Sequence, residues 1–227
     1  MSKSSAAVIA GSDEHERESA LLAAARSVFV EVGFDASAIS EIARRAGVAA
    51  GTVYLYFDDK RTLLHYVLAD FVEDLTGDIE AGLADLEDRR PEARLRFVIA
   101  RHLDALIAEP ELCALFVREV HAPDGGVDGQ IRRLKQRYAS VLSHVLEEGM
   151  ASGALRNDIP LALAQAIVFG GLEQLTLRTW TGRPVIDGAV DGILRLLVKP
   201  APSASDASLA AVLQKLDRIS EKLGVTK

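Results

Sequence analysis

Hydrophobic residues recur at helical spacing along most of this chain, in stripes that glycine, proline and short polar turns interrupt. The first stripe predicts a helix with one apolar face, made by Leu21, Leu22, Ala25, Val28, Phe29 and Val32. Ser12 is a candidate cap for this helix, acidic residues follow it, and Gly33 is expected to end it. Residues 1–12 are expected to form a disordered tail.

The next stretch, residues 38–60, predicts two short helices joined by a tight turn. Its small apolar residues Ile39, Ile42, Ala43 and Ala46 fall at i, i+3, i+4 and i+7. Gly47 follows where the first helix must stop, because a left-handed backbone suits glycine best. The second helix is expected over Ala50 to Tyr56, with Val53 and Phe57 inward. Such a pair forms a helix-turn-helix, whose second helix can enter the DNA major groove.

The outward side of the second short helix carries groups that suit DNA. Gly51 lets the backbone approach another surface closely, and Thr52 offers a hydroxyl and a methyl group. Tyr54 and Tyr56 end in hydroxyls that can meet phosphates. The candidate DNA-binding residues are Arg44, Arg45, Ala50, Gly51, Thr52, Tyr54, Tyr56 and Lys60. The alternative is a helical hairpin within a core, with two half-buried tyrosines.

Further helices are expected along the rest of the chain. Their predicted ranges are 59–86, 91–108, 110–120, 130–152, 160–180 and 186–198. The first of these is the natural mechanical link between a ligand site and the DNA-reading helices. Residues 199–207 are expected to be a linker, and 208–227 a C-terminal amphipathic helix.

The two helices expected over 160–180 and 186–198 are too apolar for a free surface. Two such helices from each of two chains would build a four-helix interface in a homodimer. Burial within a monomer is the alternative. Gly170 and Gly171 interrupt the first helix at a cost of about 1 kcal/mol each relative to alanine, so close packing or a ligand is expected to compensate.

Length and composition fit a small domain joined to a larger one. The chain has 227 residues, of which 49% are hydrophobic, and a single cysteine, Cys113, so no internal disulfide can form. No stretch is long and apolar enough for a membrane span, and a cytoplasmic location is expected.

The charge argues for selective rather than tight DNA binding. The net charge is −7, and residues 1–65 hold seven Lys and Arg against nine Asp and Glu, a balance of −2. Binding would therefore depend on Arg44, Arg45, Lys60 and Arg61, which lie around the helix-turn-helix.

The sequence contains no recognisable set of catalytic residues. The five histidines are scattered, Cys113 lacks the surroundings of a nucleophile, and no HxxxH, CxxC or glycine-rich phosphate loop occurs. We therefore expect no catalysis, no metal and no cofactor. A hydrolase on a helical scaffold remains an alternative that turnover of model esters would support.

One segment resembles the DNA-binding signature of TetR-family repressors. The shared residues are Gly33-Phe34, Ile42-Ala43, Ala46-Gly47-Val48, Gly51-Thr52-Val53-Tyr54, Tyr56-Phe57 and Lys60. The resemblance implies an all-α homodimer that binds a palindromic double-stranded DNA operator. It implies a helix-turn-helix DNA-binding domain over 13–58 and a helical effector-binding and dimerisation domain over 59–198.

The chain departs from this signature at Ala38 and Ala49. The family commonly has Ser or Thr there, which cap a helix and touch phosphate, and loss of a cap costs about 1 kcal/mol. Ser37 is a candidate cap one position early. These departures and the negative charge leave open a helical interaction protein that has lost DNA binding.

The stretches GVAAGTVYLYF and AQAIVFGGLEQLTLRTW resemble the acyl-CoA-responsive FadR-type branch of TetR repressors. The resemblance implies a lipophilic effector, a fatty acyl-CoA, that releases the repressor from DNA. The alternative is a repressor of efflux or other catabolic genes that responds to a different lipophilic molecule. The candidate effector-binding residues are His102, Phe116, Arg118, Arg133, Phe169, Glu173 and Trp180.

Overall fold

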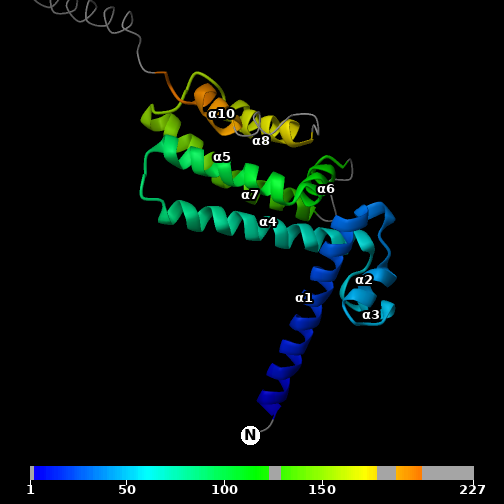
Figure 1. The fold of residues 1–227 in the computed structure, drawn as a ribbon. Helices are drawn as coiled ribbons and strands as arrows, with labels where there is room; N and C mark the ends of the chain where they lie inside the picture. Colours follow the sequence, from blue (N-terminus) through cyan, green and yellow to red (C-terminus); the bar gives the residue numbers. More distant parts are fainter. Residues whose placement is uncertain (1–2, 123–128, 178–187, 201–227) are drawn as a thin grey trace, which may run out of the picture.

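The computed structural model describes residues 3–122, 129–177 and 188–200, which form α-helices joined by short turns (Figure 1). Within these ranges no β-strand occurs, and one isolated bridge pairs Leu155 with Val198. The predicted all-α fold class is therefore confirmed.

Helix α1, Lys3–Ala36, is longer than the sequence pattern predicts. It continues back through the alanine-containing segment before Ser12, so the predicted cap at Ser12 and the predicted disordered tail do not match the structure. Alanine is the strongest helix former, which accounts for this extension. At its other end Gly33 adopts φ 78°, a left-handed conformation that breaks the regular helix where the sequence predicted an end.

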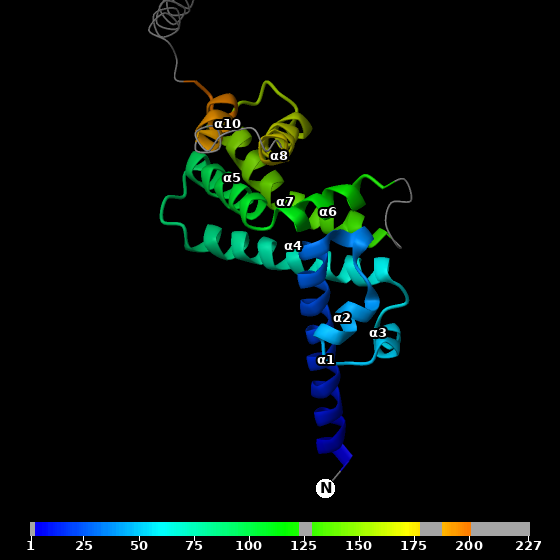
Figure 2. The ribbon, with the colours of Figure 1, turned by 45° about the vertical axis from the view of Figure 1, so that its right-hand side comes forward.

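Helices α2, Ile39–Arg45, and α3, Ala50–Tyr56, lie beside the C-terminal half of α1, as two views of the ribbon agree (Figures 1 and 2). The N-terminal half of α1 extends away from the body of the molecule. Both short helices occupy the predicted ranges.

Helix α4, Lys60–Asp85, begins where Asp59 caps it, because the Asp59 carboxylate accepts a 2.7 Å hydrogen bond from the Thr62 amide. Helices α5, Pro91–Ala108, and α6, Pro110–Val120, each begin at a proline. The first turn of a helix tolerates proline because its amide would lack a partner there in any case.

Helices α7, Gln130–Ser152, α8, Leu161–Leu177, and α10, Ala189–Leu197, complete the C-terminal part. Figure 1 shows α5 and α7 between α4 on one side and α8 with α10 on the other. The predicted helices over 160–180 and 186–198 are observed within the described residues.

Two apolar cores meet along α4. The first joins α1, α2 and α3 to the start of α4 and to Leu112 and Leu115 of α6. The second lies among α5, α7, α8, α10 and the later turns of α4. Helix α6 therefore packs its buried leucines with the N-terminal core although it follows α5 in the chain.

The expected linker continues beyond Pro200, and its remainder and the expected C-terminal helix lie outside the described residues. No helix in the described part of the chain is long and apolar enough to cross a membrane.

Candidate functional site: the α3 surface and the interhelical cavity

The turn between α2 and α3 depends on Gly47, which has φ 71°. Its neighbour Val48 donates a 2.9 Å hydrogen bond back to the Ala43 carbonyl, and this bond closes the turn. Ala38 and Ala49 occupy the two N-cap positions without a side-chain hydrogen bond, as expected for alanine. The predicted cap by Ser37 is wrong, because its hydroxyl donates to the Phe34 carbonyl instead, at 2.6 Å.

The outward face of α3 is apolar and aromatic. Tyr54 is 55% exposed and Leu55 is 82% exposed, while Ala50 and Gly51 are also exposed. A Cβ atom added at Gly51 would meet nothing within 4 Å in the described part of the chain, so this glycine leaves room for an approaching surface. Leu55 was missed from the sequence, although it lies two positions after the inward Val53 and therefore faces outward. These exposed residues, with the half-buried Thr52, are called the α3 surface below.

The two arginines of α2 are held by carboxylates of the chain itself. Arg44 donates two hydrogen bonds to Glu41, at 2.7 and 2.8 Å. Arg45 donates one to Glu41 at 2.8 Å and forms an ion pair with Glu31 at 2.7 Å. The hydrogen bonds from Arg44 and Arg45 lower the pKa of Glu41 to about 2. The carboxylates therefore offset part of the positive charge that both arginines would offer to a DNA phosphate.

Lys60 and Tyr56, both predicted to contact DNA, have partners within the protein. The Lys60 ammonium donates to the carbonyls of Phe34 and Ser37, at 2.8 and 2.9 Å, and lies 4.6 Å from the centre of the Phe34 ring. Tyr56 packs partly buried against the N-terminal core. Lys60 thus fastens the start of α4 to the end of α1.

A buried carboxylate joins α4 to α6. Glu119 of α6 is 4% exposed, and its Oε2 accepts hydrogen bonds from Arg61 Nε at 3.0 Å and from His65 Nε2 at 2.9 Å. His65 must donate here, because an ionised carboxylate only accepts. These three residues are called the α4–α6 joint below.

Two more contacts connect α6 with α1. Arg118 lies 3.3 Å from the Asp35 carboxylate and 5.3 Å from the centre of the Phe34 ring. Just before the helix starts, Glu109 accepts a 2.7 Å hydrogen bond from Arg26. The two ends of α6 are therefore both bonded to α1, which shares the N-terminal core with α2 and α3.

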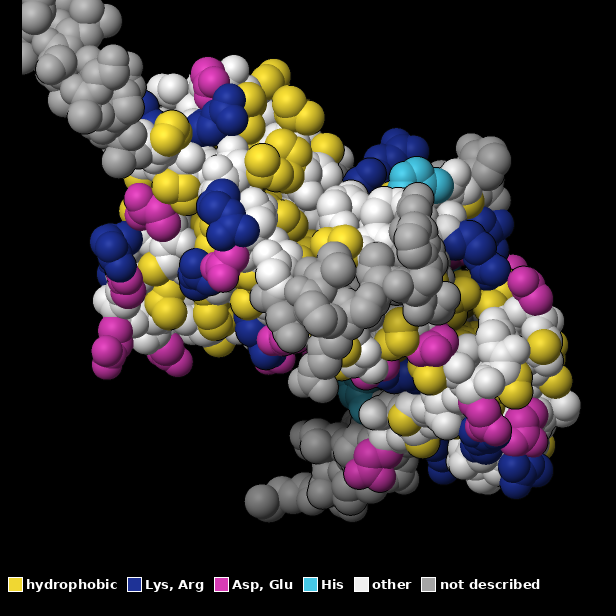
Figure 3. Space-filling view, turned by 45° about the horizontal axis from the view of Figure 1, so that its top comes forward, with side chains coloured by type: hydrophobic (Ala, Val, Ile, Leu, Met, Phe, Trp, Pro, Cys, Tyr) yellow, Lys and Arg dark blue, Asp and Glu magenta, His cyan; other side chains and the backbone are white. Residues whose placement is uncertain are grey.

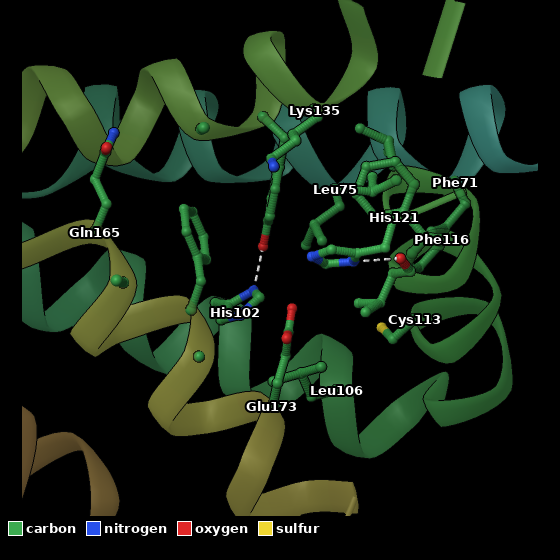
Figure 4. Close-up of a pocket in the computed structure, with 18 residues that line it drawn as sticks. Phe71, Leu75, His102, Leu106, Cys113, Phe116, His121, Lys135, Gln165 and Glu173 are labelled. Atoms are coloured by element: carbon green, nitrogen blue, oxygen red, sulfur yellow. Dashed lines mark hydrogen bonds between the residues drawn. The ribbon is translucent and has the colours of Figure 1, made fainter. Parts of the chain in front are cut away.

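A cavity of about 410 Å³ lies among α4, α5, α6, α7 and α8 (Figure 4). Its apolar wall includes Phe71, Leu75, Leu106, Phe116, Val120 and Phe169. Four of the predicted effector residues line it, namely His102, Phe116, Phe169 and Glu173. Sequence reasoning missed Cys113, His121, Lys135, Tyr138 and Gln165, which also line it.

Two of the other predicted effector residues, Arg118 and Arg133, are not in this wall. Arg118 points to Asp35 and Phe34, as described above. Arg133 lines a separate groove between α4 and α7, together with Tyr66 and Arg137. Trp180 lies outside the described residues. Arg118 and Arg133 therefore do not line this cavity, and their predicted contact with the effector stays a prediction.

The polar groups of the cavity wall are largely neutral. His102 Nδ1 and the Tyr138 hydroxyl form a hydrogen bond with each other. Burial lowers the pKa of His102 to about 4 and raises that of Cys113 to about 12, so the imidazole and the thiol are uncharged near neutral pH. Burial also raises the pKa of Glu173, although His121 and Lys135 oppose this effect. In Figure 4 the Glu173 carboxylate points into the space between His102 and His121.

The comparisons with known proteins agree with this arrangement. Residues 21–67 match the family of "Bacterial regulatory proteins, tetR family", and residues 67–190, more than half of the chain, match "YsiA-like protein, C-terminal region". The chain belongs to the TetR family. It is therefore a transcriptional regulator of a family whose members bind DNA operators as dimers.

Similar TetR-family proteins come from several bacteria. The fatty acid metabolism regulator protein of Bacillus subtilis is 29% identical over 70% of this chain and 81% of its own length. The transcriptional repressor KstR2 of Rhodococcus jostii is 30% identical over 65% of this chain and 72% of its own length. These relatives are transcription regulators rather than enzymes.

Solved structures show the same TetR fold. The regulator FadR from Bacillus subtilis in complex with stearoyl-CoA superimposes with a TM-score of 0.66 and 25% identity, over 79% of this chain and 97% of that one. FadR from Bacillus halodurans superimposes with a TM-score of 0.67 and 23% identity, over 78% of this chain and 94% of that one.

A second exposed apolar surface of this TetR-family chain, besides the α3 surface, lies on α8 and α10. Leu163 and Leu196 are about half exposed, and Ala162 and Ala166 of α8 are also exposed. Figure 3 shows hydrophobic side chains gathered over this end of the molecule. These residues belong to the two helices that the sequence marked as too apolar for a free surface.

Proposed function

We propose that this TetR-family regulator is a repressor whose effector is a lipophilic thioester of the fatty acyl-CoA class. The observation that carries the proposal is the apolar cavity bounded by α6. A cavity of about 410 Å³ falls within the usual range for small-molecule sites. The Bacillus subtilis FadR structure contains stearoyl-CoA and shares this fold, which supports the same class of ligand here.

Gly170 supports a ligand that fills the cavity closely. This residue lies in the cavity wall, and a Cβ atom added to it would meet nothing within 4 Å among the described residues. A glycine inside a helix costs about 1 kcal/mol relative to alanine. Because no close packing within the described part of the chain requires Gly170, we assign its role to leaving room for the effector.

Two basic side chains at the cavity edge suit the charged end of such a ligand. Lys135 and His121 line the cavity and are both exposed, so an acyl chain could enter while a phosphate remains near these side chains. Lysine binds phosphate as a mobile point charge, without the fixed geometry of arginine. Lys135 therefore replaces Arg118 and Arg133 as the proposed phosphate contact.

Helix α6 is the proposed link between ligand and DNA. One side of α6 supplies Phe116 and Val120 to the cavity. Glu119 of the same helix accepts hydrogen bonds from Arg61 and His65 of α4. A ligand that shifts α6 must move or break the α4–α6 joint, and α4 begins four residues after the last residue of α3. The ligand would thereby favour a dimer whose two α3 surfaces no longer fit grooves roughly 34–36 Å apart.

The proposed DNA contacts lie on the α3 surface and on α2. Tyr54 supplies a phosphate contact, Thr52 and Gly51 allow close approach, and Arg44 and Arg45 exchange carboxylates for phosphates. The exposed Leu55 offers an apolar group that suits a thymine methyl. The proposed dimer contact is the apolar surface of α8 and α10.

The effector proposal is tested by calorimetric titration with saturated acyl-CoAs of increasing chain length. Each added methylene should improve the dissociation constant about fourfold, equivalent to about 0.8 kcal/mol, until the cavity is full. Gly170→Leu should shift this limit to shorter chains, whereas Gly171→Ala, beside the cavity, should not. An affinity independent of chain length, or stabilisation by an aromatic drug panel alone, would point to a different effector.

Operator binding is tested by a gel shift with the DNA upstream of the protein's own gene. Tyr54→Phe should weaken binding about tenfold, because a charged phosphate loses a hydrogen bond, and should leave dimerisation intact. Tyr66→Phe on α4 is the matched control. A wild-type protein that binds no DNA under low salt would instead support an interaction protein that has lost this activity, and unaltered affinity of Tyr54→Phe would remove its phosphate contact.

A further inference from the structure

The bonded pair of His102 and Tyr138 has one more polar hydrogen than it can use. A neutral imidazole carries one N–H and a phenol carries one O–H, and one of these two hydrogens forms the bond between them. The second hydrogen requires an acceptor. Within the described part of the chain neither residue has another hydrogen-bond partner, and His102 Nε2 is buried without one.

The position of this pair shows where the missing acceptor would lie. If the hydroxyl donates to His102, the spare hydrogen is on Nε2, which is buried in the protein. If Nδ1 donates to the hydroxyl, the spare hydrogen is on Tyr138, whose side chain lines the cavity. The second arrangement leaves only a lone pair buried on Nε2 and directs the donor toward the cavity. A buried donor without an acceptor is unfavourable, so this arrangement is preferred when a ligand supplies one.

The surroundings hold the pair in place before any ligand binds. The Phe169 ring lies edge-on to His102, with 5.0 Å between ring centres, and 5.6 Å from the Tyr138 ring. The three side chains come from α5, α7 and α8, so the packing of three helices fixes the donor. Figure 4 shows His102 among the residues that line the cavity, with a dashed line for its hydrogen bond.

We propose that Tyr138, held by His102, donates a hydrogen bond to an oxygen atom carried by the buried part of the effector. The inference rests on the proposed function, since it places this oxygen in the same cavity. A plain hydrocarbon tail at this position would leave the donor without an acceptor. Two sources of the oxygen share this chemistry, namely the thioester carbonyl of an acyl-CoA and a hydroxyl group on its chain.

Matched ligands distinguish the two sources by calorimetric titration of the full-length protein. The affinity of stearoyl-CoA is compared with that of S-octadecyl-CoA, a thioether without the carbonyl. The difference measures the contribution of the thioester oxygen. The affinity of a mid-chain hydroxystearoyl-CoA is compared with that of stearoyl-CoA. This difference measures the contribution of an oxygen on the acyl chain. In one of these pairs the oxygen-bearing member should bind about tenfold more tightly, the effect of one hydrogen bond.

Variants show whether the preference comes from this donor. Tyr138→Phe removes the hydroxyl and should reduce the tenfold preference to less than about twofold. His102→Phe keeps the hydroxyl but removes the group that orients it, and should reduce the preference to an intermediate value. Tyr66→Phe on α4 is not in the cavity wall and should keep the full preference. Circular dichroism melts confirm that each variant is folded.

Three outcomes separate the inference from the proposed function. Equal affinity within both ligand pairs, or a preference that persists in both variants, overturns the inference while the acyl-CoA proposal stands. If none of the CoA compounds binds, the proposed effector is wrong. The comparison is then made between free stearate and a mid-chain hydroxystearate, and equal or absent binding there overturns the inference as well.

Discussion

Two buried histidines, His65 on α4 and His102 on α5, have similar bonding but different surroundings. Their exposed fractions are 0% and 6%. In each, one ring nitrogen is bonded and the other has no hydrogen-bond partner among the described residues. His65 is bonded to the carboxylate of Glu119, which also accepts from Arg61. His102 is bonded to the neutral hydroxyl of Tyr138. A hydrogen bond to a charged group is roughly twice as strong as one between neutral groups.

The space beside each histidine separates their roles. His65 lies in the α4–α6 joint and lines none of the cavities described above, so its contribution is to hold two helices together. His102 lines a cavity of about 410 Å³, where a ligand can reach its partner Tyr138. The same residue type thus serves the transmission of a signal in one region and the recognition of a molecule in the other.

The largest expected effect comes from removing the acceptor in the joint. Glu119→Ala leaves Arg61 and His65 without their carboxylate and should lower the free energy of unfolding by about 3 kcal/mol, measured by urea denaturation. Glu80→Ala is the matched control, because Glu80 pairs with Arg137 on the surface, at 2.7 Å. It should cost less than about 1 kcal/mol. Equal losses of unfolding free energy in the two variants would show that the α4–α6 joint stabilises the protein no more than a surface ion pair does.

Replacing each histidine by phenylalanine tests the comparison directly. His65→Phe leaves a buried carboxylate short of one donor and should cost about 2 kcal/mol of unfolding free energy. His102→Phe frees only the Tyr138 hydroxyl, which can turn toward the cavity, so the cost without ligand should be below about 1 kcal/mol. A larger loss for His102→Phe than for His65→Phe would reverse the assignment of roles.

The sequence predicted the helices well because their ends depend on local chemistry. Gly33 and Gly47 adopt the left-handed backbone expected of them, and the prolines at 91 and 110 begin helices where proline is tolerated. The start of α1 was missed, because the alanine-containing segment before Ser12 can continue a helix without any cap.

The candidate site was predicted only in part, because long side chains turn according to what lies beside them in space. The sequence predicted Arg118 as a phosphate contact because of its charge. In the structure Arg118 donates to Asp35, a residue distant in the chain. Lys60 likewise turns to backbone carbonyls at the end of α1. The pairing of His102 with Tyr138 joins two helices, so no spacing along the sequence could reveal it.

The pH dependence of stability separates His102 from the other groups. Burial lowers its pKa from 6.5 to about 4, so the unfolded chain binds more protons than the folded one between these values. The unfolding free energy should therefore fall as the pH drops from 6.5 toward 4, by at most about 1.4 kcal/mol per pH unit. His102→Phe should flatten this dependence in urea titrations at several pH values. An unchanged slope in the variant would mean that His102 is not buried as a neutral base.

The smallest expected effect concerns Glu173, which lines the same cavity. Burial raises the pKa of this carboxyl above 4.5, so the folded protein holds its proton more tightly than the unfolded chain. Stability should decline as the pH rises from 4.5 through the folded pKa, which is opposite in sign to the effect of His102. The decline should be shallow, because Glu173 is only half-buried and because His121 and Lys135 partly offset the burial.

Glu173→Gln should remove this decline and slightly raise the melting temperature above the folded pKa. Glu80→Gln provides a control of opposite sign, since the hydrogen bond from Arg137 lowers the pKa of Glu80 and contributes stability above pH 4.5. That variant should slightly lower the melting temperature in the same range. If both variants shifted the melting temperature in the same direction, Glu173 would be as well solvated as the surface residue Glu80. The contrast between the cavity and the closed α4–α6 joint would then lose its physical basis.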